Sequence, residues 1–152
     1  MIRVINGDLF DATAETICHQ VNCQGAMNSG VALQVKQKYP HVFEAYKNYC
    51  EEHEGNLLGT VLPVECNNGS NSLTICNLFA QDEFGYDGNC YTSYEALQNC
   101  FDILDDTLPE NTSIAFPFLM GCHRGGGDWN LVYKMIEDTF SKHDILICKR
   151  SE

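Results

Sequence analysis

The chain has few basic residues. Nine Lys and Arg stand against 21 Asp and Glu among its 152 residues, which gives a formal net charge of −12 at pH 7. A surface of this sign repels phosphate polymers, because nucleic-acid binding depends on Lys and Arg to neutralise backbone phosphates. The composition therefore argues against general binding of duplex DNA.

Long apolar runs are also absent. The longest nearly unbroken stretch, from Ile114 to Met120, is far shorter than the roughly 20 residues that a membrane-spanning helix needs. The N-terminal segment MIRVINGDLF contains no signal-like apolar region. We therefore expect a cytoplasmic protein without a membrane partner.

The nine cysteines form no CxxC pair, and they show no Cys/His spacing of the kind that binds zinc. Thiols in a cytoplasmic protein mostly stay reduced. We therefore interpret these cysteines as mainly structural, and we predict neither a metal site nor a cofactor.

The remaining composition is that of a globular protein, with 44% hydrophobic and 20% charged residues. No internal repeat, low-complexity tract or Pro- or Ser-rich linker interrupts the chain. The length suits a single domain. We expect one domain over residues 1–152, and we expect it to be a monomer.

Short β-branched runs alternate with helical periodicities. Strands are predicted at residues 3–5, 16–21, 60–64, 73–79, 113–118 and 144–148, and helices at 31–39, from 42, from Thr92 and from Asp128. Thr92 and Glu95 stand in capping-box register, and Asp128 is expected to cap the last helix. Strands interleaved with helices predict an α/β protein, a three-layer α/β/α sandwich around a central mixed sheet of about six strands.

Two Gly-rich connections lead from a predicted strand into a predicted helix, VNCQGAMNSGVA at 21–32 and PFLMGCHRGGGDW at 117–129. Small residues let backbone N–H groups approach a ligand, and the helix N-terminus that follows favours an anion. An acidic protein could in this way bind a phosphate compound through backbone amides. Neither loop matches the P-loop or the dinucleotide-binding GxGxxG pattern, so a purely structural role for each loop stays open.

Several segments, in order along nearly the whole chain, resemble a macro domain, the ADP-ribose-binding module. They are INGDLF, ICHQVNCQGAMNSGVALQVKQKYP, ICNLFAQ, TSYEAL and FPFLMGCHRGGGDWNLVYKMIEDTF. The motif HQVN, in place of NAAN, favours the branch that contains the terminal ADP-ribose protein glycohydrolase and the yeast ADP-ribose 1″-phosphate phosphatase. The resemblance implies the three-layer fold and binding of ADP-ribose or an ADP-ribosylated substrate.

The resemblance also implies which residues bind. Asp8 would accept a hydrogen bond from the adenine amino group beside the Leu9 backbone, although a carboxylate in this context is also a common turn or helix cap. Phe118 or Cys148 would flank the adenine unless they are core residues. The ribose and diphosphate would contact two sets of residues, namely Asn22, Gly25, Met27, Asn28, Ser29, Gly30 and Val31 on one side and Cys122, His123, Arg124, Gly125 and Gly126 on the other.

Two positions depart from the glycohydrolase pattern. Gln81 stands where the relative has a nucleophilic lysine, and Gly125 stands where it has an assisting aspartate. A glutamine amide is not a covalent nucleophile and glycine supplies no acid or base, so a lysyl adduct is not expected. His123 is the candidate general base that remains, unless its ring only faces solvent or a backbone carbonyl, and Arg124 is a candidate phosphate contact unless it is only a solvated loop residue.

Three function classes follow from these residues. The first is hydrolysis of an ADP-ribose derivative, either by removal of ADP-ribose from a carrier or by cleavage of a terminal phosphate. The second is a reader that binds ADP-ribose without turnover. The third, which the retained loops favour least, is a small α/β domain used for protein contact.

Overall fold

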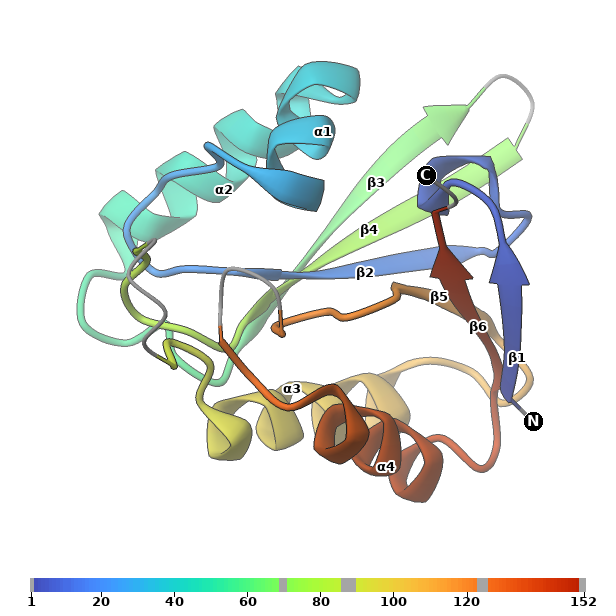
Figure 1. Ribbon diagram of the computed structural model, residues 1–152. Helices are drawn as coiled ribbons and strands as arrows, with labels where there is room; N and C mark the ends of the chain where they lie inside the picture. The colour runs from blue at the N-terminus through green and yellow to red at the C-terminus, as the bar shows by residue number, and fades with distance from the viewer. Residues whose placement is uncertain (1, 69–70, 86–89, 123–125, 151–152) are drawn as a thin grey trace.

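The computed structural model describes residues 2–68, 71–85, 90–122 and 126–150. Strands and helices follow one another in the order predicted from the sequence (Figure 1). The strands are β1 (Ile2–Asn6), β2 (Thr16–Val21), β3 (Val61–Asn68), β4 (Asn71–Phe79), β5 (Ser113–Pro117) and β6 (Asp144–Lys149). The helices are α1 (Gly30–Lys38), α2 (Pro40–Glu52), α3 (Tyr94–Thr107) and α4 (Trp129–Thr139), and a short 3-10 helix, η1 (Leu9–Asp11), follows β1.

The strands form one six-stranded mixed sheet in the order β1-β6-β5-β2-β4-β3. All neighbouring pairs are parallel except β3 and β4, which form an antiparallel pair at one edge. The carboxyl ends of the five parallel strands therefore meet at one edge of the sheet. In open α/β sheets this edge is where ligands bind.

Helices cover both faces of the sheet, with α1 and α2 on one side and α3 and α4 on the other (Figure 1). Side chains of β2 alternate between the two layers: Ile17 and Val21 join the core under α1 and α2, whereas Cys18 joins the core over α3 and α4. The predicted three-layer α/β/α sandwich with a mixed six-stranded sheet is confirmed.

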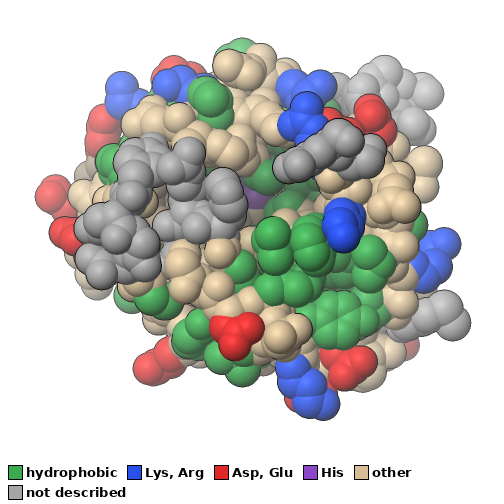
Figure 2. Space-filling view, in the orientation of Figure 1, with side chains coloured by type: hydrophobic (Ala, Val, Ile, Leu, Met, Phe, Trp, Pro, Cys, Tyr) green, Lys and Arg blue, Asp and Glu red, His purple; other side chains and the backbone are tan. Residues whose placement is uncertain are grey.

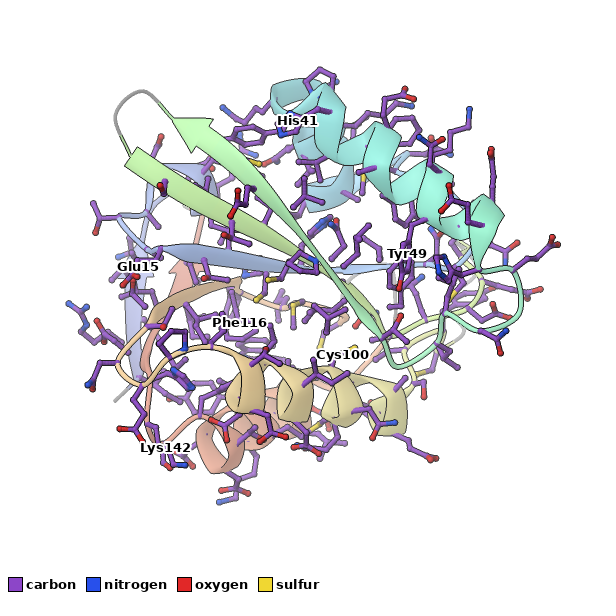
Figure 3. The ribbon with its side chains drawn as sticks, turned by 180° about the vertical axis from the view of Figure 1, so that it is seen from behind. Glu15, His41, Tyr49, Cys100, Phe116 and Lys142 are labelled. Atoms are coloured by element: carbon purple, nitrogen blue, oxygen red, sulfur yellow. The ribbon has the colours of Figure 1, made fainter. Side chains whose placement is uncertain are left out.

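The α3/α4 layer is built around three fully or nearly fully buried phenylalanines. Phe101 lies edge-on to Phe116 and Phe140, with ring centroids 5.6 and 5.3 Å apart. Figure 3 shows Phe116 from the sheet and Cys100 from α3 in the space between these layers. Edge-to-face rings at this spacing add to the free energy of burying their area, so this cluster fixes how α3 and α4 sit on the sheet.

The structure corrects one capping prediction. Ser93, not Thr92, is the N-cap of α3, and its Oγ accepts from the Ala96 N–H at 3.1 Å. Thr92 instead forms an isolated β-bridge with Gln81, and its hydroxyl serves the site described below. Asp128 caps α4 as predicted, because its Oδ1 accepts from the Asn130 N–H at 3.0 Å.

The cysteines carry no disulfide, and six of the nine are buried. Among the described residues no group of three or more His, Cys, Asp or Glu side chains could hold a metal ion. None of the helices in the described part of the chain is long and apolar enough to cross a membrane.

Candidate functional site

Two adjoining hollows lie at the carboxyl ends of the parallel strands. The first, the β2 hollow, has a volume of about 310 Å³, and the second, the β1 hollow, has a volume of about 510 Å³. They share four lining residues, Val31, Pro117, Phe118 and Leu119. Figure 2 shows this face of the molecule, with a histidine side chain visible deep in the hollowed region. Because they share these residues, the hollows form one cleft, and the four shared residues mark its middle.

Each hollow has its own set of lining residues. Besides the shared four, the β2 hollow is lined by His19, Gln20, Val21, Asn22, Ala26, Asn28, Ser29, Gly30, Ala32, Gln81, Phe84, Gly85, Met120 and Gly121. The β1 hollow is lined by Asn6, Asp8, Leu9, Gln34, Cys148, Lys149 and Arg150.

Asn22 fixes the loop that leads from β2 to α1. Its Oδ1 accepts from the Gln24 N–H at 2.9 Å, and its Nδ2 donates to the Ala26 carbonyl at 2.9 Å. The Tyr46 hydroxyl, on α2, lies 2.7 Å from Asn22 Oδ1 and 2.8 Å from Asn22 O. Burial raises the pKa of Tyr46, so this hydroxyl remains a donor. The buried tyrosine thus holds the start of the loop in one conformation.

The N-terminus of α1 opens onto both hollows. Ser29 is its N-cap, but the serine side chain makes no capping hydrogen bond. Gly30 follows with a φ of 58°, which is a conformation that glycine adopts without strain. The first-turn N–H groups of a helix have no intrahelical partner, so this end offers donors to an anion at the middle of the cleft.

A network of hydrogen-bonded side chains closes one side of the β2 hollow. Gln20 Nε2 donates to Gln81 Oε1 and to Thr92 Oγ1, each at 2.8 Å. Thr92 in turn donates to the Gly121 carbonyl at 2.7 Å, and Gln81 Nε2 donates to the Glu83 carbonyl at 2.9 Å. These bonds fix which end of each amide is the donor. The Gln81 side chain therefore connects β2 to the segment after β4 through hydrogen bonds.

His19, also on β2, lies at the floor of the β2 hollow and is 1% exposed. Its Nε2 is 2.6 Å from Asn77 Oδ1, while Asn77 Nδ2 donates to the Leu62 carbonyl at 3.0 Å. Asn77 Oδ1 must then be an acceptor, so Nε2 carries the proton. Desolvation by burial lowers the pKa of His19 to about 4, with the Asn77 hydrogen bond acting in the opposite direction. At neutral pH the ring is uncharged, and Nδ1 presents a bare lone pair.

His19 and Gln20 entered the interpretation of the sequence only as part of the motif HQVN, and neither was predicted to line the site. The available signal was the run of polar side chains at the end of a strand that otherwise reads as buried. Buried polar groups nearly always find partners, so His, Gln and Asn in close succession on a central strand indicate a polar site.

In the β1 hollow, Asp8 has a double role. Its Oδ1 accepts from the Phe10 N–H at 2.9 Å and caps η1. Among the described residues, none hydrogen-bonds to the second carboxylate oxygen, so capping leaves an acceptor for a ligand. Burial first, and the charge of Asp8 second, raise the pKa of the Cys148 thiol, which lines the same hollow.

Phe118, which is aromatic, and Leu119, whose backbone is strained, separate the two hollows. Phe118 packs edge-on against Trp129, with centroids 5.4 Å apart, and Lys149 Nζ lies 4.9 Å from the centroid of the Phe118 ring. Leu119, which is 36% exposed, has a φ of 65°. Left-handed backbone at a residue other than glycine is costly, and such residues concentrate where ligands are held.

The other predicted site residues fall into three groups. Asn22, Asn28, Ser29, Gly30, Val31 and Gln81 line the β2 hollow, and Asp8 and Leu9 line the β1 hollow. Gly25, Met27, Cys122 and Gly126 are not among the residues that line either hollow; the Met27 side chain is fully buried in the core and the Cys122 thiol donates to the Met120 carbonyl. His123, Arg124 and Gly125 lie outside the described residues.

Comparison with known proteins agrees with this architecture. The family model of the Macro domain matches residues 18–136. A 17.5 kDa protein of Enterobacteria phage T4, described as uncharacterized, is 30% identical over 97% of this chain and 95% of its own length. An ADP-ribose 1″-phosphate phosphatase of Debaryomyces hansenii is 31% identical over 56% of each chain. A DNA ADP-ribosyl glycohydrolase of Mycobacterium tuberculosis is 44% identical over 36% of this chain, which spans only 15% of that protein.

Solved structures show the same fold. The macrodomain of Mycobacterium tuberculosis DarG superposes with a TM-score of 0.77 at 24% identity, covering 97% of each chain. Thermosipho africanus DarTG in complex with ADP-ribose superposes with a TM-score of 0.82 at 16% identity, covering 97% of this chain and 41% of that one. The chain belongs to the macro domain family.

The Tyr46 hydroxyl provides a first test of how the site is held. Tyr46→Phe should lower the free energy of unfolding by about 1–2 kcal/mol, because the buried Asn22 oxygens lose a donor. The quantity to measure is the midpoint and slope of urea unfolding. Tyr133→Phe on α4 is the matched control, since its hydroxyl makes no hydrogen bond that the structure describes, and it should change stability little. Equal effects of the two variants would contradict the assignment.

The low pKa of His19 predicts a pH dependence of stability. In the unfolded chain the His19 side chain binds a proton near pH 6.5, whereas in the folded protein it does so only near pH 4. The contribution of neutral His19 to the free energy of unfolding is therefore complete above pH 6.5. This contribution decreases as the pH falls toward 4, by up to about 1.4 kcal/mol per pH unit. Urea unfolding at pH 7 and pH 5 should show a smaller loss for His19→Gln than for the wild type. The exposed His41→Gln should keep the wild-type loss, and identical losses in all three proteins would show that His19 does not titrate abnormally.

Proposed function

We propose that ADP-ribose binds along the cleft, with adenine in the β1 hollow, the distal ribose in the β2 hollow and the diphosphate at the middle, where the two hollows share their lining. The observation that carries this proposal is that the two hollows adjoin and share Val31 and Pro117 to Leu119. A dinucleotide-like ligand has two bulky ends joined by a charged linker, and the cleft has this form. Each hollow lies in the range of roughly 300–1,000 Å³ that is usual for ligand sites.

The chemistry of each part supports this orientation. In the β1 hollow, the second oxygen of Asp8 is placed to accept from an amino group, and Phe118 offers a ring face to a base. At the middle, the free N–H groups of α1 suit a diphosphate. In the β2 hollow, His19 Nδ1 is an acceptor for a ribose hydroxyl. A structural neighbour is reported in complex with ADP-ribose, and the macro domain family gives the same expectation.

We further propose that the protein hydrolyses an ADP-ribose derivative without a lysyl adduct. Relatives are named as an ADP-ribosyl glycohydrolase and an ADP-ribose 1″-phosphate phosphatase. Among the described residues that line the β2 hollow there is no lysine, and both ends of the Gln81 amide are hydrogen-bonded. Attack by a water molecule on the anomeric carbon or on a terminal phosphate is the route that these residues favour. His123 remains the candidate base.

A reader without turnover is the second candidate function. It is favoured by the absence of an evident base in the described part of the β2 hollow. His19 is buried there, but with a pKa of about 4 it is a weak base at neutral pH. General-base catalysis works best when the pKa lies near the working pH. His19 can therefore orient a hydroxyl more readily than it can remove a proton.

A calorimetric titration tests binding. ADP-ribose should bind with a Kd near a micromolar, about −8 kcal/mol, and AMP should bind much more weakly because it leaves the β2 hollow empty. Asp8→Ala should weaken ADP-ribose binding by roughly 1.5–3 kcal/mol, the range for hydrogen bonds with a charged partner. Asp11→Ala, which removes an exposed carboxylate of the same 3-10 helix, is the control. Equal affinities for AMP and ADP-ribose would refute the proposed orientation, and binding by Asp8→Ala within twofold of wild type would refute the adenine contact.

Trapping during turnover tests the route of hydrolysis. The protein is mixed with an ADP-ribosyl ester and borohydride, and its intact mass is then measured. No ADP-ribose mass should be added, because Gln81 provides no amine. If turnover occurs, His123→Ala should lower kcat by about 10²–10⁴-fold, the usual contribution of a general base, with ADP-ribose affinity nearly unchanged. A trapped adduct would point to another lysine, for example Lys36, and an unchanged kcat would remove His123 from the mechanism.

A further inference from the structure

The unpaired polar atoms of the β2 hollow share one property. Both His19 Nδ1 and Gln20 Oε1 are buried, and neither has a hydrogen-bond partner in the part of the chain that the structure describes. The bonds of their neighbours force both to be acceptors: His19 uses its proton on Asn77, and Gln20 uses its amide N–H groups on Gln81 and Thr92. A buried acceptor without a partner is costly, so this hollow favours a ligand that brings hydrogen-bond donors.

The position of Gln20 Oε1 is fixed, and so is its role as an acceptor. A Cβ on Gly121 would lie only 2.6 Å from this oxygen, so glycine is needed there and the β5–α4 connection passes directly against it. The opposite end of the same side chain is tied to two partners. The amide cannot turn over to present N–H groups to a ligand without breaking both bonds.

Negative charge lies next to the lining of the β2 hollow, on two residues that are not themselves part of that lining. The exposed acidic pair Asp82 and Glu83 connects two residues that line the hollow, Gln81 and Phe84. Hydrogen bonds from Cys23 N–H and Gln24 Nε2 to the Asp82 carbonyl, at 3.0 and 3.1 Å, hold this pair beside the β2–α1 loop.

The two hollows differ in charge. None of the described residues that line the β2 hollow is Lys or Arg, whereas Lys149 and Arg150 both line the β1 hollow. Phe84, at the mouth of the β2 hollow, is 43% exposed and presents an apolar ring to whatever the distal ribose carries. An aromatic ring beside carboxylates is a favourable environment for a guanidinium group.

We propose that the β2 hollow selects ADP-ribose whose anomeric carbon is joined to a nitrogen of an arginine side chain in a peptide, and that it disfavours ADP-ribose 1″-phosphate. This inference rests on the proposed function, because it assigns the distal ribose to this hollow. Ribose hydroxyls and guanidinium N–H groups are donors, so they satisfy His19 Nδ1 and Gln20 Oε1. A terminal phosphate brings only acceptors and negative charge to a place whose described lining offers unpaired acceptors and no Lys or Arg, with Asp82 and Glu83 close by.

The experiment compares three ligands in displacement of a fluorescently labelled ADP-ribose probe. They are ADP-ribose, ADP-ribose 1″-phosphate and an arginine-containing peptide ADP-ribosylated on the guanidinium. Displacement is read before turnover accumulates, and chromatography of each mixture verifies that the ligand is intact. The arginine conjugate should bind at least tenfold more tightly than the 1″-phosphate, with ADP-ribose between them.

A charge-neutralising pair and a matched control locate the source of the preference. Asp82→Asn with Glu83→Gln should reduce the ratio of the two affinities at least threefold. Asp106→Asn with Glu110→Gln makes the same change in net charge at exposed positions of α3 and the turn after it, and should leave the ratio within twofold of wild type. All these side chains are exposed, so both variants are expected to fold.

The outcomes are separable. If the labelled probe does not bind, the proposed function itself is wrong. If the probe binds but the 1″-phosphate binds as tightly as the arginine conjugate or more tightly, only the inference about the substrate is wrong. If the α3 control reduces the ratio as much as the acidic pair does, the preference reflects net charge and the assignment to the mouth of the hollow is overturned.

Discussion

Three polar side chains near the carboxyl end of the central strand β2 must be hydrogen-bonded inside the protein, and meeting this requirement assembles the site. His19 pairs with Asn77 on β4, Gln20 pairs with Gln81 and Thr92, and Asn22 pairs with Tyr46 on α2. Each bond joins β2 to a different part of the fold. Because a lost partner in the interior costs about 1–3 kcal/mol, the elements around the cleft are held in mutual register by groups that themselves line it or support it.

The same requirement decides what the cleft can recognise. The paired N–H groups of His19 and Gln20 all donate to other groups of the protein. The acceptors that remain, His19 Nδ1 and Gln20 Oε1, face the β2 hollow. A low pKa keeps His19 neutral, so its lone pair persists across the physiological pH range. Specificity therefore follows from the way in which the fold satisfies its own buried groups, and a site of this kind is rigid because a rotated amide would lose two bonds at once.

Much of the fold was predictable from the sequence, since β-branched runs and helical spacing dominate strands such as β2 and helices such as α4. The error at Thr92 has a physical cause: Thr92 and Ser93 are both good N-caps, and only the tertiary bond from Thr92 to Gly121 decides between them. The Gly-rich loop after β2 contains predicted residues that line the cleft, such as Asn28 and Gly30, whereas residues 123–125 of the second predicted loop lie outside the described residues. The run of polar residues at the end of β2 indicated a polar site, but it could not show which atoms of His19 and Gln20 are left unpaired, because this depends on partners far away in the chain, such as Asn77 and Thr92.

An acidic chain that binds an anionic ligand requires an explanation in terms of local fields. At the middle of the cleft, unpaired N–H groups of α1 supply partial positive charge that acts within a few ångströms, and Lys149 Nζ lies nearby, 4.9 Å from the centroid of the Phe118 ring. Among the described residues that line the cleft, the basic side chains, Lys149 and Arg150, belong to the β1 hollow, whereas Asp82 and Glu83 stand near the β2 hollow. The cleft therefore has a polarity along its length: an anionic diphosphate is accommodated at the middle, and any further negative charge is repelled more strongly at the β2 end than at the β1 end. Long-range charge and short-range donors thus act on different parts of one ligand. The net charge of −12 is therefore compatible with binding a nucleotide. The same charge restricts which groups that nucleotide can carry at its distal ribose.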